Sequence, residues 1–123
     1  MIYDPSVETR PVAEQFALDR DAYRQQIQYL FENSAFYQRK LREAGFDNAG
    51  AVGDLDDIAR LPLTEKDELR KTQASAPPFG EHLSCPPEEL RRVFSTSGTT
   101  GVPCYLGLTS SDIDMYATNV ARG

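Results

Sequence analysis

The stretch STSGTTGVP (Ser95–Pro103) holds five hydroxyl side chains and two glycines within nine residues. Glycines at 98 and 101 permit positive φ angles and leave no Cβ between the main chain and an approaching ligand. Successive N–H groups can then point at one anion, and the hydroxyls add rotatable donors. The composition alone fits either an ordinary glycine-containing hairpin turn or a phosphate-binding loop.

The flanking residues predict that this stretch joins two strands. RRVFS (91–95) and CYLGLT (104–109) read as the strands of a hairpin, and Thr109 with Asp112 predicts the capped start of a final helix. Because a lone hairpin is marginally stable in water, its aliphatic residues Val93, Leu106 and Leu108 need a further sheet or helix to cover them. We therefore expect the chain to be an incomplete part of a domain, with 88–123 forming a hairpin plus helix.

Residues 1–73 predict a helical subregion. A long helix is expected from Pro11 to about Phe31, with Pro11 in its first turn, and a second from Ala35 to Ala44 that ends at Gly45. The spacing of four apolar residues predicts one apolar face of an amphipathic first helix: Phe16, Tyr23, Ile27 and Leu30.

Two shorter helices and a connector are expected next. Asp54 and Asp57 predict the start of a short helix that runs to Arg60, and Thr64 predicts the cap of another. Residues 74–87 contain four prolines, which predicts a connector without regular structure between the helices and the strands.

Composition excludes several classes of function. The formal net charge is -6, with the basic residues scattered along the chain, so no nucleic-acid partner is expected. No apolar run approaches the ~20 residues of a membrane-spanning helix, and the first residues lack the pattern of a signal peptide, so we expect no membrane partner and a cytoplasmic location. Cys85, Cys104 and His82 do not form a metal-site pattern: the cysteines read as small, partly buried thiols and His82 as a surface loop residue.

The order of residues within Ser95–Pro103 distinguishes a phosphate-binding loop from an ordinary hairpin turn. A Walker A loop needs GxxxxGK[ST], and the chain contains no Gly-Lys pair. TSGTTG (96–101), with Val93 upstream and Pro103 downstream, instead resembles the phosphate-binding loop of adenylate-forming enzymes. Four other segments resemble, in the same order, the amino-terminal part of the phenylacetate-CoA ligase family: YDPSVET (3–9), FENSAFYQRKLREAGF (31–46), LDDIARLPLTEKDELR (55–70) and TSSDID (109–114).

This resemblance implies an α/β fold, of which residues 1–123 would be an incomplete amino-terminal portion of the large domain. It implies an acid-thiol ligase that uses ATP, Mg²⁺ and coenzyme A to convert an aromatic carboxylate into a thioester through an acyl-adenylate, and a homodimer is plausible. The expected nucleotide-binding residues are the loop residues Ser95, Thr96, Ser97, Gly98, Thr99, Thr100 and Gly101, of which Ser95 and Thr96 form the edge. No catalytic or metal-binding residue is assigned, and we expect the 123-residue chain alone to be inactive.

Two residues depart from the pattern of the family. Val102 stands where many members of the superfamily carry lysine, and Cys104 stands where the signature has lysine or arginine, or threonine in many phenylacetate-CoA ligases. The loop therefore supplies no cation to the phosphates.

Two alternatives from other classes remain open. One is a non-enzymatic nucleotide- or anion-binding module that uses only the hairpin loop. The other is a helical dimerisation module, since the apolar face of the first long helix could pack on another chain.

Overall fold

The computed structural model describes residues 2–96 and 101–122. Its amino-terminal part consists of α1 (Pro5–Glu8), α2 (Val12–Asn33) and α3 (Ala35–Glu43). Ser34 separates the last two helices, and its hydroxyl accepts a hydrogen bond from the N–H of Tyr37 at 3.3 Å, which caps α3. Gly45 follows α3 with a φ of 91°, the left-handed conformation that glycine adopts without strain. The predicted break and helix end are confirmed, whereas Pro11 is the N-cap of α2 and not part of its first turn.

Three further helical segments follow: η1 (Ala49–Val52), η2 (Leu55–Arg60) and α4 (Lys66–Ser75). Asp54 and Asp57 cap η2 as predicted, although the segment is a 3₁₀ helix. The prediction that Thr64 caps α4 is wrong. Glu65 is the N-cap residue, and its N–H donates to the Glu68 carboxylate at 2.7 Å. This acidic pair satisfies an N–H at the start of the helix and places negative charge where the helix dipole favours it.

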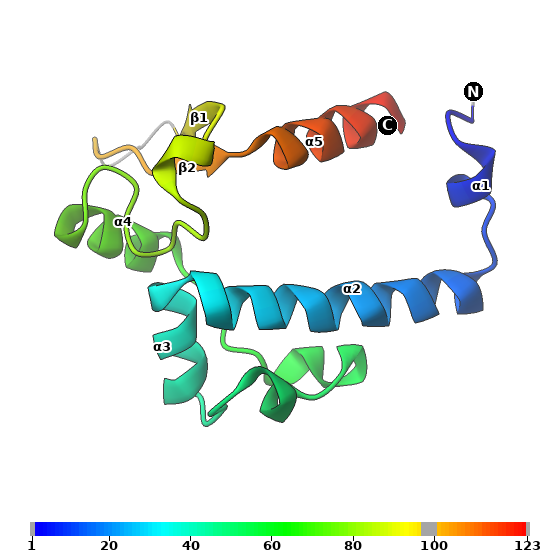
Figure 1. Cartoon of the computed structure of the whole chain (residues 1–123), viewed down its shortest axis with the longest axis horizontal. Helices are drawn as coiled ribbons and strands as arrows, with labels where there is room; N and C mark the ends of the chain where they lie inside the picture. The colour runs from blue at the N-terminus through cyan, green and yellow to red at the C-terminus, as the bar shows by residue number, and fades with distance from the viewer. Residues whose placement is uncertain (1, 97–100, 123) are drawn as a thin grey trace.

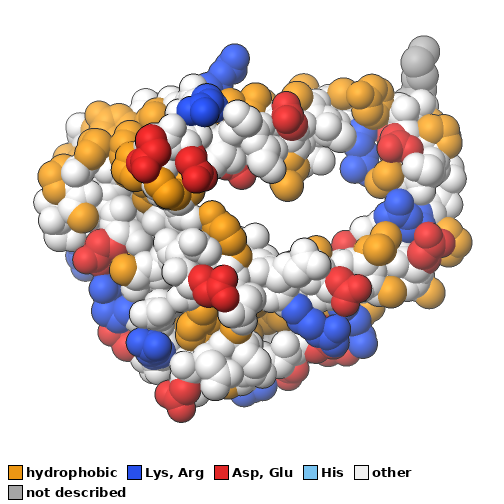
Figure 2. Space-filling view, in the orientation of Figure 1, with side chains coloured by type: hydrophobic (Ala, Val, Ile, Leu, Met, Phe, Trp, Pro, Cys, Tyr) orange, Lys and Arg blue, Asp and Glu red, His pale blue; other side chains and the backbone are white. Residues whose placement is uncertain are grey.

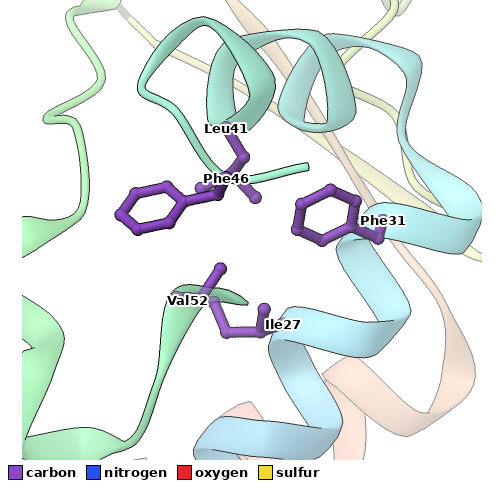
Figure 3. Packing of buried hydrophobic residues seen from close by; sticks show 5 residues of the cluster. All are labelled: Ile27, Phe31, Leu41, Phe46 and Val52. Atoms are coloured by element: carbon purple, nitrogen blue, oxygen red, sulfur yellow. The ribbon is translucent and has the colours of Figure 1, made fainter. Parts of the chain in front are cut away.

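A small hydrophobic core forms where α2, α3 and η1 meet (Figure 3). Its buried members are Ile27, Phe31, Leu41, Phe46 and Val52, with Val52 fully buried. The predicted face of α2 is therefore buried only in part: Ile27 is in the core, whereas Phe16 is 42 % exposed. The reason is geometric, because the amino-terminal half of α2 extends past the elements that form the core (Figure 1).

The carboxy-terminal part holds η3 (Pro87–Glu89), a two-stranded antiparallel sheet of β1 (Arg92–Ser95) and β2 (Tyr105–Leu108), and α5 (Ser110–Arg122). Thr109 caps α5 as predicted: its N–H donates to the Asp112 carboxylate at 2.8 Å, and its hydroxyl accepts from the N–H of Asp112 at 3.3 Å.

The two long helices lie on opposite sides of an opening that passes through the molecule (Figures 1 and 2). Arg122 at the end of α5 and Glu8 in α1 approach to 3.7 Å, which closes the opening at one end. Within the described residues, no helix is both long enough and apolar enough to span a membrane.

Candidate functional site

The loop singled out by the sequence is carried on the β1–β2 hairpin. Ser95 pairs with Tyr105 at the end of the sheet. The N–H of Thr96 donates to the carbonyl of Cys104 at 3.0 Å, and the N–H of Cys104 donates to the Thr96 hydroxyl oxygen at 3.1 Å. Two hydrogen bonds therefore close the base of the loop from its inner side.

The structure describes three of the seven predicted nucleotide-binding residues. Ser95 ends β1 with its side chain exposed, and Thr96 is half-buried with its hydroxyl bonded to the main chain of Cys104. Gly101 has a φ of 83°, the left-handed backbone conformation that side chains with a Cβ rarely adopt. This conformation explains why a glycine stands at 101. Ser97, Gly98, Thr99 and Thr100 lie outside the described residues.

The two departures from the family's loop pattern occupy different environments. Val102 is 56 % exposed, so a longer side chain at this position would extend into solvent beside the loop. Cys104 is 1 % exposed and packs inside the molecule. The thiol at 104 therefore fills space beneath the hairpin and does not face a ligand on the solvent side of the loop.

A glutamine that the sequence analysis did not single out contacts the outer side of the loop's return arm. Gln73, on the last turn of α4, is 9 % exposed. Its amide nitrogen donates to the carbonyl of Pro103 at 3.0 Å, and its amide oxygen accepts from the N–H of Tyr105 at 2.8 Å. A lone glutamine near the end of a predicted helix carries no local pattern that reveals these contacts, because its partners are about 30 residues away in sequence.

His82 is not the surface residue that the sequence analysis expected. It is half-buried, with Nδ1 2.7 Å from the hydroxyl oxygen of Thr72, the residue next to Gln73. Burial lowers the pKa of His82, and the neighbouring main chain of Tyr105 offsets this in part. Burial therefore favours the neutral imidazole, which links the connector to α4 through Thr72.

A cavity of about 880 Å³ lies between α2, the connector, β2 and the start of α5. Tyr29, Tyr37 and Leu106 contribute to its walls, and Cys85 lines it on the connector side. Burial raises the pKa of the Cys85 thiol, with nearby carboxylates adding to the effect. A thiol that resists ionisation is a poor nucleophile, which agrees with the interpretation of Cys85 as a small, partly buried thiol.

Comparisons with known proteins place the chain among its relatives. No family model matches it. It is 40 % identical over 122 residues to the phenylacetate-coenzyme A ligase of Thermus thermophilus, which covers 99 % of this chain and 26 % of the relative. It is 37 % identical over 123 residues to the phenylacetate-coenzyme A ligase of Escherichia coli, with shares of 97 % and 26 %.

The chain belongs to the phenylacetate-coenzyme A ligase family. It corresponds to an amino-terminal part of these proteins and spans about a quarter of the length of the curated ligases that it matches. The resemblance inferred from the loop and from the four flanking segments is confirmed.

Solved structures of a CoA ligase resemble this chain in fold. A 2-hydroxyisobutyryl-CoA ligase in complex with 2-HIB-AMP and CoA, in the thioesterification state, superposes with a TM-score of 0.86 at 39 % identity, covering 96 % of this chain and 25 % of that one. The same kind of ligase in the postadenylation state with 2-HIB-AMP gives a TM-score of 0.87 at 35 % identity, with shares of 98 % and 25 %. The predicted fold class, the amino-terminal portion of a CoA ligase with a helical front, a hairpin and a final helix, is confirmed.

Proposed function

We propose that this chain is the amino-terminal part of an ATP-dependent ligase that joins an aromatic or arylacetic acid to coenzyme A. In the first step the carboxylate attacks the α-phosphate of ATP, forming an acyl-adenylate and releasing pyrophosphate. In the second step the thiol of coenzyme A attacks the acyl carbon, forming the thioester and releasing AMP. The observation that carries the proposal is the TSGTTG loop, held at the end of a hairpin in a chain that aligns over nearly its whole length with phenylacetate-coenzyme A ligases.

We propose that the loop binds the β- and γ-phosphates of ATP. Ser97, Thr99 and Thr100 would donate through their hydroxyls, and Gly98 and Gly101 through the main chain, whereas Ser95 and Thr96 form the edge of the site. Negative charge develops on pyrophosphate as it leaves, and donors fixed in advance lower the barrier because they need not reorganise during the reaction. The hydrogen bonds at the loop base and the left-handed Gly101 support such a fixed arrangement.

Mg²⁺ would arrive with ATP as part of the nucleotide substrate. In the ranges 2–96 and 101–122, no group of three or more His, Cys, Asp or Glu side chains is arranged to hold a metal ion. The described residues thus contain no such cluster for Mg²⁺.

We also propose that the chain consists of the three parts that the sequence predicts. Residues 1–73 would be a helical subregion, 74–87 a connector, and 88–123 the unit that carries the loop. The catalytic residues would lie outside this chain, so the 123-residue chain alone should not form acyl-adenylates.

The test is ATP–pyrophosphate exchange by the parent ligase, the longer polypeptide that would carry this chain at its amino end. Phenylacetate, benzoate, hydroxylated benzoates and 2-hydroxyisobutyrate form the panel of acids. Exchange that depends on an aromatic acid supports the proposal, and exchange with 2-hydroxyisobutyrate alone would replace the aromatic substrate by an aliphatic one. A folded polypeptide that binds ATP without exchange on any acid would favour a nucleotide-binding module. Exchange by the 123-residue chain itself would refute its proposed inactivity.

A variant tests the role of the loop within the same assay. Replacing Ser97, Thr99 and Thr100 by alanine should raise the KM for ATP. Thr118→Ala is the matched control, because Thr118 is exposed on α5 and its hydroxyl donates to the carbonyl of Asp114 on the same helix. An equal effect of both changes would contradict the phosphate contact.

A second candidate function, homodimerisation through α2, has its own support. Val12, Phe16 and Leu18 on the amino-terminal half of this helix are 82 %, 42 % and 47 % exposed. Removing the first 50 residues would not test the idea, because it would also remove four of the five core residues. Phe16→Glu, compared with Gln25→Glu on the same helix, should convert a dimer into a monomer in sedimentation. A monomer for the unaltered protein would exclude the candidate.

A further inference from the structure

The return arm of the loop, Pro103 to Tyr105, lies at an edge of the hairpin. Tyr105 pairs with Ser95, while the next residue, Cys104, exchanges hydrogen bonds with Thr96. In an antiparallel pair, successive residues point their N–H groups alternately toward the partner strand and away from it. Because the N–H of Cys104 points toward β1, the N–H of Tyr105 points away from the hairpin, where β1 cannot accept it.

Gln73 takes the place of a strand at this edge. Its amide oxygen accepts from the N–H of Tyr105 at 2.8 Å, and its amide nitrogen donates to the carbonyl of Pro103 at 3.0 Å. The two partners flank Cys104, so one side chain makes both a donor and an acceptor bond to the same stretch of main chain. A buried amide costs free energy unless its polar atoms are bonded, and both polar atoms of Gln73 are bonded here.

The helix that carries Gln73 is itself fixed to the rest of the protein. The ammonium of Lys40 on α3 lies 2.5 Å from the carboxylate of Glu68 on α4, and the Lys40 side chain is only 12 % exposed. Thr72, next to Gln73, bonds to His82 of the connector. Gln73 therefore links the loop to an element held at two other points.

We propose that Gln73 is a positioning residue for ATP: it fixes the return arm, Pro103 to Tyr105, and so sets the base of the proposed phosphate-binding loop. The proposal rests on the proposed function of the loop. Thr96 holds the arm from its inner side and Gln73 from its outer side. Loss of Gln73 should leave the fold in place and let the loop lose its binding geometry.

The test compares three variants of the parent ligase. Gln73→Leu removes both hydrogen bonds at similar volume. Gln73→Glu keeps an acceptor for Tyr105 but places an oxygen against the carbonyl of Pro103. Gln38→Leu is the matched control, because Gln38 also donates a side-chain hydrogen bond to the main chain, at 2.8 Å to the carbonyl of Phe31, and this bond joins α3 to α2 and does not involve the hairpin.

We expect both Gln73 variants to raise the KM for ATP about tenfold, the effect of losing roughly one net hydrogen bond, with the KM for the acid changed less than about twofold. Gln38→Leu should leave both KM values unchanged. An ATP KM equal to that of the unaltered enzyme, or equal rises in the KM for ATP and for the acid, would overturn the proposal.

Hydrogen exchange at the amide of Tyr105 gives a readout that does not depend on turnover. We expect faster exchange in Gln73→Leu and Gln73→Glu than in the unaltered protein, and no change in Gln38→Leu. Unchanged exchange at Tyr105 would refute the positioning role even if the ligase were inactive. Absence of adenylation by the unaltered ligase, by contrast, would refute the proposed function and not the contact.

Discussion

Thr96→Val tests whether the inner side of the loop base depends on a side-chain hydrogen bond. Valine has nearly the shape of threonine and keeps the main-chain bond from residue 96 to the carbonyl of Cys104. It removes the hydroxyl that accepts the N–H of Cys104, at 3.1 Å. Cys104 is 1 % exposed, so water has little access to replace the lost acceptor.

The magnitude follows from leaving one buried donor without a partner, which costs about 1–3 kcal/mol. A central value of about 2 kcal/mol corresponds to roughly a thirtyfold rise in the population of the opened hairpin. Thr96→Ser is the matched control, because serine keeps the hydroxyl oxygen and loses only a methyl group.

The assay is hydrogen exchange of the Cys104 amide in the 123-residue chain, followed residue by residue by NMR. The amide should exchange about thirtyfold faster in Thr96→Val and at nearly the unaltered rate in Thr96→Ser. Equal protection of Cys104 in all three proteins would refute the reasoning, since it would show that the Thr96 hydroxyl does not hold this N–H. Equal loss in both variants would also contradict it, because serine retains the hydroxyl that is proposed to accept the Cys104 N–H.

Three other perturbations test the site and the core. Val102→Lys places a cation beside the loop, at a position that is 56 % exposed. In the parent ligase this change should lower the KM for ATP about two- to fivefold at low salt. High salt should abolish the effect, because it screens the added charge. Burial lowers the pKa of His82, so the unfolded chain takes up a proton at a higher pH than the folded chain does. The urea concentration at the unfolding midpoint should therefore decrease between about pH 7 and pH 5. His82→Gln should reduce that decrease, because it removes the titrating group. Val52→Ala, at a fully buried site, should lower the free energy of unfolding by about 2 kcal/mol in urea titration, whereas Val102→Ala should change it by less than about 0.5 kcal/mol.

Features that depend on neighbours in sequence could be predicted. The Thr109–Asp112 cap, the Asp54–Asp57 cap and the glycine after α3 each involve residues within four positions of one another, and all are present. The hairpin was predictable for the same reason, because its two strands flank one short loop. The error at Thr64 arose because Glu65 and Glu68 offered a competing cap one residue later, and both alternatives look alike in sequence.

Features that depend on contacts between distant elements could not be predicted. Whether Phe16 is buried depends on how far the core extends along α2, and helical spacing does not contain that information. His82 lies in a proline-rich segment that looks like a surface loop, yet its ring is enclosed by Thr72 and by the main chain near Tyr105. The contacts of Gln73 with the return arm can be recognised only when the positions of α4 and β2 relative to each other are known.

The residues that hold the base of the loop are uncharged, and this limits the kinds of contact through which the loop would bind ATP. Thr96 and Gln73 hold the loop base through uncharged groups, Val102 supplies no cation, and the Arg91 guanidinium donates to the carbonyl of Glu88 at 3.1 Å. Phosphate binding by such a loop must come from directed N–H and hydroxyl groups, whose strength falls steeply as their geometry worsens. Variants that disturb the geometry of the base, at Thr96 or Gln73, should therefore weaken ATP binding more than the added charge at Val102 strengthens it.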